Sequence, residues 1–294
     1  MLAMKSAISR LLGLILLFLL VAMNGVAFAD VDAKETKLFT ISAKYKVVTW
    51  CLDDDENLYV YDRFTKSVYI FKHGEKQETK IAISTTSGLH RLFVDENKNI
   101  ALISSLNTLL IYNVDGDELL RGKAKFPDKY GFDRGVLYER FSGEVVYDMG
   151  LNGGDEKTLL GKVGIQFTAG YVDKQNGRYF EQAINRVDNV EHRSPTQIGD
   201  YDFCRFIDQD YEGQIYLMYC TRYKKWENGE LVWDKDKANY FNTEYLVVSF
   251  TPEMRVRWKT TGNNVFINCR IGRAYVARET KKGIVVYRCE ENAE

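Results

Sequence analysis

The sequence predicts an all-β fold, and three observations support this. A unit of short apolar runs, acidic turns and aromatic-rich segments recurs along the chain, most clearly in His90–Lys125. Aromatic residues make up 13% of the chain and alternate with polar ones, as in half-buried strands. Glycine next to Asn, Asp or His recurs between these segments, as in tight hairpin turns. His90–Lys125 holds three strand-like segments and the start of a fourth, which matches one blade of a β-propeller.

The first 29 residues have the pattern of a secretory signal peptide. Lys5 and Arg10 precede an apolar stretch, Leu11–Ala22, and the small residues Ala27 and Ala29 follow it. We therefore expect an exported protein, secreted or periplasmic, whose mature part is one domain, residues 30–294. The alternative is an uncleaved signal anchor. No later segment approaches the roughly 20 apolar residues of a membrane span, so we expect no integral membrane segment after cleavage.

The charge of the mature part argues against nucleic acid as a partner. Without residues 1–29 the chain has 38 Lys and Arg against 41 Asp and Glu, a formal charge of −3. A nucleic-acid-binding domain usually carries a clear excess of basic residues.

The five cysteines form an odd set without metal-binding spacing. None lies in a Cys-x-x-Cys pair, so a structural zinc site is poorly supported. Cys204 and Cys220 fall on consecutive predicted strands, and two interpretations stay open: a disulfide, as exported proteins often have, or two small buried residues.

Acidic residues that close the first strand of each unit give the blade count. The markers follow one another at spacings of 42, 38, 40 and 35 residues, near the period of a propeller repeat. They are Asp53, Asp95, Asp133, Asp173 and Asp208. A sixth unit without a marker takes Val265–Glu290, which predicts a six-bladed β-propeller of four-stranded antiparallel blades.

The hairpins agree with this count, and the last unit needs a strand from elsewhere. His73-Gly74, Asp115-Gly116, Asn152-Gly153 and Thr251-Pro252 each lie between two strand-like runs. The chain ends before a fourth strand of the last unit, so we expect Lys37–Ala43 to supply it. The N-terminal strand would then close the propeller and remove its free sheet edges.

The second unit resembles a repeat of the NHL type and its six-bladed relatives, the gluconolactonase-like and TolB-like propellers. The resemblance rests on Phe93-Val94-Asp95, Ile100-Ala101-Leu102 and Leu110–Asn113, followed by Asp115-Gly116. It covers the mature chain loosely and is clearest in the first, second and fifth units. The resemblance implies a fold and no particular activity.

The resemblance also implies where a ligand would bind. In these relatives the innermost strand of each blade lines a central channel, and ligands sit at one mouth. Carried over to this sequence, the candidates are His90, Arg91, Arg205 and Arg270. Guanidinium groups that converge from three blades would suit a carboxylate or phosphate. Alternatively, the arginines pair with acidic neighbours or point into solvent, and His90 is structural.

Motifs for metals and catalysis are missing from the sequence. Asp53–Asn57 is rich in oxygen ligands, but its spacing does not match a calcium loop, and aspartate in a tight turn ordinarily accepts hydrogen bonds from backbone amides. We find no nucleophile elbow, zinc-protease motif or phosphate-binding glycine loop. The sequence therefore assigns no catalytic residue, no metal ligand and no cofactor.

An insertion at about residues 222–243 is the other candidate binding surface. It carries Trp226, Trp233 and Tyr240 among charged residues, with Asn228-Gly229 as the predicted turn of a two-stranded flap. Exposed aromatic rings of this kind stack on sugars or anchor protein partners. The alternative is that they pack on the outer face of their own blade.

Two classes of function follow from the sequence. The first is an exported, non-enzymatic propeller that binds a protein, peptide or glycan through one rim. The second is a metal-dependent hydrolase or lactonase with its site at the channel mouth, as in the gluconolactonase-like relatives. The absence of recognisable ligands and catalytic motifs favours the first class.

Overall fold

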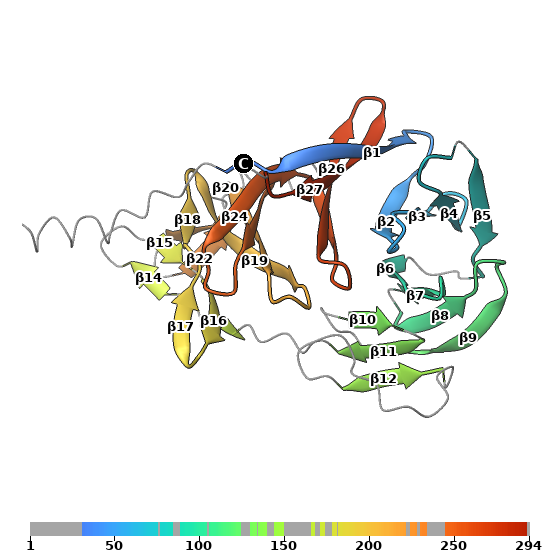
Figure 1. Ribbon diagram of the computed structural model, residues 1–294, viewed down its shortest axis with the longest axis horizontal. Coiled ribbons are helices and arrows are strands. Elements are labelled where there is room, and N and C mark those ends of the chain that lie inside the picture. The colour runs from blue at the N-terminus through green and yellow to red at the C-terminus, as the bar shows by residue number, and fades with distance from the viewer. Residues whose placement is uncertain are drawn as a thin grey trace, which may run out of the picture. The chain divides into compact units, whose positions relative to one another are not determined.

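A computed structural model of the chain is used throughout (Figure 1). The structure describes residues 31–75, 77–84, 89–104, 106–124, 130–133, 135–139, 144–149, 166–167, 171–173, 178–180, 182–221, 224–227, 230–233 and 245–292. The predicted signal peptide lies outside these residues. Every regular element within them is a β-strand. Accordingly, this part of the chain contains no helix long and apolar enough to cross a membrane.

The first two sheets are regular four-stranded antiparallel blades whose strands follow chain order. The first consists of β2 (Val47–Leu52), β3 (Leu58–Asp62), β4 (Ser67–Phe71) and β5 (Glu78–Ala82). The second consists of β6 (Leu89–Val94), β7 (Ile100–Ser104), β8 (Thr108–Tyr112) and β9 (Glu118–Lys123).

Three further sheets have blade form. One has three strands, β10 (Tyr130–Asp133), β11 (Val136–Glu139) and β12 (Val145–Asp148). One has five, β18 (Gln197–Ile198), β19 (Tyr201–Gln209), β20 (Ile215–Thr221), β23 (Tyr245–Phe250) and β24 (Val256–Gly262). The last has four, in the order β1 (Lys34–Ser42), β27 (Gly283–Glu290), β26 (Arg273–Thr280) and β25 (Asn264–Asn268).

Smaller pieces complete the described strands. A three-stranded sheet is formed by β13 (Gln166–Phe167), β16 (Ala183–Val187) and β17 (Val190–Arg193). Two hairpins form separate two-stranded sheets, β14 (Tyr171–Asp173) with β15 (Arg178–Phe180), and β21 (Lys224–Glu227) with β22 (Glu230–Trp233). The described residues thus form an all-β propeller arrangement of antiparallel sheets.

Five sheets of blade form are present in the described residues, where the sequence predicted six. The difference lies in the predicted fourth unit, where β13 has only two residues and Asp173 ends a strand of a separate hairpin. Strand number also departs from four, because β18 adds to the fifth unit and three strands are described in the third.

The N-terminal strand pairs with the C-terminal one, as predicted. β1 runs antiparallel to β27 from Lys34 opposite Glu290 to Ser42 opposite Gly283. Gly283 has φ +133°, and a Cβ there would lie 1.9 Å from the Ile41 carbonyl oxygen, so only glycine allows this approach. Closure of a complete ring stays a prediction.

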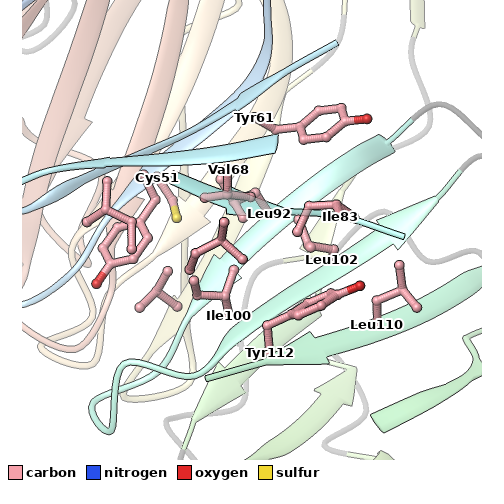
Figure 2. Close-up of a cluster of buried hydrophobic side chains, with 13 residues drawn as sticks. Cys51, Tyr61, Val68, Ile83, Leu92, Ile100, Leu102, Leu110 and Tyr112 are labelled. Carbon is pink, nitrogen blue, oxygen red and sulfur yellow. The ribbon is translucent and has the colours of Figure 1, made fainter. Parts of the chain in front are cut away.

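Packing between sheets supplies the hydrophobic core. Figure 2 shows the cluster between the first two blades, in which Tyr61 and Val68 from one sheet face Leu92, Ile100 and other side chains from the next. Ile100 and Val68 are fully buried. Burying a side chain of this size contributes about 2 kcal/mol. The cluster sets β2 beside β6 and so places two inner strands next to each other.

A buried aspartate follows the innermost strand in three sheets and organises the next turn. Asp53 accepts hydrogen bonds from the amides of Asp55 and Asn57, at 3.0 and 2.8 Å. Asp95 accepts one from the Asn99 amide in the same way, and Asp210 accepts one from Gln214. The predicted structural role of the turn aspartates is therefore confirmed at Asp53. In the fifth unit the marker is Asp210, so the prediction of Asp208 was wrong by two residues.

None of the five cysteines, all of which lie among the described residues, forms a disulfide. The Cys204–Cys220 disulfide is therefore absent, and the physical reason is the strand register. A bulge between Phe203 and Arg205 takes Cys204 out of the pairing, and Cys220 lies opposite Asp202 instead. The alternative, that these cysteines are small buried residues, fits Cys220, which is buried, whereas Cys204 is only half-buried.

We predict that Asp53→Ala destabilises the protein far more than Asp55→Ala. Asp53 is completely buried and also binds Tyr59 and Lys98, so its loss leaves several buried donors without an acceptor and costs about 3 kcal/mol. Asp55 binds the same lysine, but its side chain is 72% exposed, and its loss costs at most about 1 kcal/mol. Urea unfolding of both variants measures the difference, and equal losses would contradict a special role of the buried turn carboxylate.

Candidate functional site

The innermost strands of the five blade-like sheets line one cavity of about 380 Å³. β2, β6, β10, β19 and β25 each contribute side chains, and Tyr138 of β11 adds one more. This is where the sequence placed a channel, and Arg91, Arg205 and Arg270 all line it. Whether they bind a ligand stays a prediction.

Irregular pairing places Thr49, Arg91 and Arg205 at matching positions around the cavity. Thr49 and Arg91 each lie four residues before the buried turn aspartate of their own sheet. Arg205 lies five residues before Asp210, because its strand contains a second bulge. Each follows a β-bulge in its own inner strand. Bulges redirect a side chain and are frequent beside functional sites. Arg91 and Arg205 are both exposed.

Arg270 differs from these two exposed arginines because its side chain is largely buried. Its Nε and Nη2 donate to Asp54, the Nη2 distance being 2.9 Å. Its Nη groups also donate to the carbonyl oxygens of Val94 and Phe132. The side chain is only 12% exposed. Arg270 therefore connects the ends of β6 and β10 to the turn after β2.

The electrostatic effect of this contact appears at Asp54. Partial burial acts to raise the pKa of the Asp54 carboxyl, but hydrogen bonds from Arg270 and Asn268 outweigh it, and the pKa lies below its ordinary value. The Asn268 side chain donates at 2.8 Å. Asp54 is therefore a stable carboxylate at neutral pH and neutralises the nearest arginine.

Aromatic rings form much of the remaining wall. Trp50 is 6% exposed and its ring centroid lies 6.1 Å from that of Phe266. Phe93, Phe132 and Tyr138 come from the neighbouring strands. Flat apolar rings beside exposed guanidinium groups suit a ligand that combines a carboxylate with an apolar or planar part.

No group of three or more His, Cys, Asp or Glu residues in the described part of the chain is arranged to hold a metal ion. The backbone of His90 lies in β6, but its side chain is outside the described residues. The gluconolactonase-like alternative is neither supported nor tested by these residues.

The predicted flap of the insertion is present as a backbone feature. β21 pairs antiparallel with β22, with Trp226 opposite Leu231 and Lys224 opposite Trp233. The side chains of Trp226 and Trp233 and the whole of Tyr240 lie outside the described residues. Their proposed stacking role is therefore untested.

Comparisons with known proteins give similarity of fold alone. No family model matches the chain, and no curated protein matches it. The chain is similar to a solved streptogramin B lyase structure at 11% identity, covering 88% of this chain and 98% of that chain with a TM-score of 0.42.

Two other solved structures show similarity of the same order. A virginiamycin B lyase from Staphylococcus aureus has 7% identity, coverage of 88% and 100%, and a TM-score of 0.43. YCF48 bound to D1 peptide has 10% identity, coverage of 88% and 97%, and a TM-score of 0.40. With TM-scores below 0.5, these similarities support no conclusion about the activity of this chain, and its class rests on its own sheets: an all-β protein with a propeller arrangement.

We predict that Asp54→Asn lowers stability near neutral pH by about 1 kcal/mol and has a smaller effect in acid. Because the folded-state pKa is depressed, the ion pair stabilises the fold above the unfolded carboxyl pKa of about 3.9, and this contribution is lost as the pH falls through the lower folded value. Urea unfolding across this pH range tests it. Glu291→Gln, which removes a half-exposed partner of Arg257, serves as the control. A pH-independent loss in Asp54→Asn would contradict the assignment.

Proposed function

We propose that this chain is an exported, non-enzymatic propeller that binds a protein or peptide partner, and that an acidic side chain of the partner enters the cavity between the inner strands. One observation carries the proposal. Arg91 and Arg205 are exposed at matching positions of two inner strands and lie beside aromatic walls.

The chemistry of these groups favours a carboxylate. A guanidinium group offers a planar pair of N–H donors that matches a carboxylate, and such charge-assisted hydrogen bonds are stronger than neutral ones. We assign Arg91 and Arg205 to the ligand because both are exposed and line the cavity, whereas the Arg270 side chain is only 12% exposed. Trp50 and Phe266 would contact the apolar part of the same partner.

The number of blades and the closure of the ring belong to the same proposal. We infer that β13, β16 and β17 represent the sixth blade and that the pairing of β1 with β27 closes the ring. A closed ring would enclose the cavity by inner strands on all sides. Export would follow from the apolar segment near the N-terminus.

Selection of peptides from a random phage-displayed library tests the binding function. We expect the wild-type chain to enrich peptides that contain Asp or Glu. Arg91→Gln with Arg205→Gln is expected to weaken binding of a selected peptide by about tenfold for each arginine. Fluorescence polarisation of the labelled peptide measures this.

Arg186→Gln with Arg193→Gln is the matched control, because both arginines are exposed and pair with Glu191 on the β16–β17 hairpin. It changes net charge by the same amount. Selection of peptides without acidic residues, or equal loss of binding in the control, would refute the proposed role of the cavity arginines. Binding of a uronic acid in place of peptides would point to a glycan.

A further inference from the structure

The contacts at the ends of the inner strands define two ends of the cavity. Lys98, just after β6, lies 3.0 Å from Asp53, which directly follows β2. Arg270 joins the neighbouring Asp54 to the Val94 carbonyl at the end of β6. β2 and β6 therefore finish at the same end. Because their sheets are antiparallel, the β3–β4 and β7–β8 turns lie at the opposite end, where β2 and β6 begin.

Three segments at this opposite end form one connected surface. The Ala43 amide donates to the Lys282 carbonyl at 3.1 Å, joining the β1–β2 link to the β26–β27 turn. The Arg63 amide donates to the Lys46 carbonyl at 3.0 Å, joining the same link to the β3–β4 turn. We call residues 43–46, 63–66 and 281–282 the basic face.

The basic face carries exposed cations without internal partners. Five exposed side chains make no ion pair with any residue that the structure describes: Lys46, Arg63, Lys66, Lys281 and Lys282. A sixth cation, Lys44, lies 3.9 Å from Glu78. Of the nearby acids, Asp62 is buried by its own turn and Glu279 is exposed. The face therefore has a clear positive excess in a chain whose net charge is −1.

Two apolar tips project at the same end. Phe64 is 85% exposed in the β3–β4 turn, and Leu106 is 74% exposed in the matching β7–β8 turn of the next blade. These are the most exposed large hydrophobic side chains in the described part of the chain. Phe64 lies within the basic face itself, between Arg63 and Lys66 in sequence.

The other end exposes more acidic side chains than the basic face does, alongside the exposed Lys72 and Arg255. The turns that follow the inner strands, together with the β8–β9 turn, expose acidic side chains: Asp55, Glu96, Asp115, Asp117 and Glu212. A protein that is acidic overall thus concentrates unpaired cations around projecting apolar tips on one face. Cations attract an anionic surface, and an apolar tip inserts where a surface has an apolar interior.

We propose that the basic face binds the surface of an anionic lipid bilayer, with Lys and Arg near the headgroup phosphates and Phe64 and Leu106 inserted among the acyl chains. Highly exposed apolar side chains on turns suit insertion into a fluid layer, whereas a protein anchor needs a fitted pocket in its partner. This membrane attachment is separate from ligand binding in the cavity and does not depend on it.

Co-sedimentation with vesicles tests the proposal on the chain from Asp30 onward, which contains every described strand and buried cluster. We expect binding to vesicles of phosphatidylglycerol with phosphatidylcholine, no binding to phosphatidylcholine alone, and release by salt. Lys66→Glu with Lys282→Glu should weaken binding at least about tenfold. Phe64→Ala should weaken it by about fivefold to tenfold while leaving salt dependence intact.

Matched variants at the acidic end control for charge and apolarity. Lys72→Glu with Arg255→Glu makes the same charge change on turns that follow β4 and β23, and Tyr211→Ala removes a 57% exposed aromatic ring. These should bind vesicles like the wild type, as should Arg91→Gln with Arg205→Gln. The proposal is overturned if phosphatidylcholine alone binds equally, if the control variants lose binding as much, or if soluble polyglutamate binds while vesicles do not.

Discussion

The fold depends on buried acidic groups that follow the innermost strands of three sheets and connect each of these sheets to a neighbouring one. Asp95 accepts a hydrogen bond from the Gly135 amide of the following sheet at 2.9 Å, and Asp53 reaches Lys98. At Asp210 the link runs through Tyr216, whose hydroxyl lies 2.9 Å from the carboxylate and 3.4 Å from the Gly272 carbonyl. A buried carboxylate is costly unless it is fully hydrogen-bonded, so each of these groups requires correct placement of two neighbouring sheets.

The spacing of the repeat located some of these buried aspartates and missed others, because the repeat is regular in sequence only where the sheets themselves are regular. Asp53 and Asp95 were found, since their sheets have matching lengths and turns. Asp208 was taken in place of Asp210 because the bulges in β19 add residues that spacing cannot reveal. A better signal was available in the sequence. Asp53 and Asp210 are each followed by Asn or Gln four residues later and by Tyr six residues later. Asp173 failed because its segment forms a separate hairpin.

The location of the cavity could be predicted from the sequence, but the contacts of the charged side chains that line it could be predicted only in part. Inner strands were identified from their position in the repeat, so Arg91 and Arg205 could be assigned to the lining. The contacts that bury Arg270 could not be predicted from the sequence. Its partners Asp54, Val94 and Phe132 lie 216, 176 and 138 residues away along the chain. A long-range pair of this kind leaves no local pattern. The contacts of Glu56 are equally long-range, because Arg288 and Tyr275 of the C-terminal sheet donate hydrogen bonds to its carboxylate.

These contacts explain why the two ends of the cavity differ in what remains for function. Where the inner strands finish, Arg270 pairs with Asp54, and Asp53 accepts hydrogen bonds from its own turn and from Lys98 of the next sheet, so this end holds sheets together. Where the strands begin, the buried carboxylate of the β3–β4 turn, Asp62, accepts hydrogen bonds from the Lys46 and Phe64 amides and the Thr65 hydroxyl, all within its own sheet and the link that enters it. The buried carboxylate of that turn therefore constrains its own sheet and sets no requirement on the placement of a neighbouring one. A basic residue or an exposed ring can be placed there without loss of fold, and that is the end at which the chain carries Phe64 amid unpaired cations.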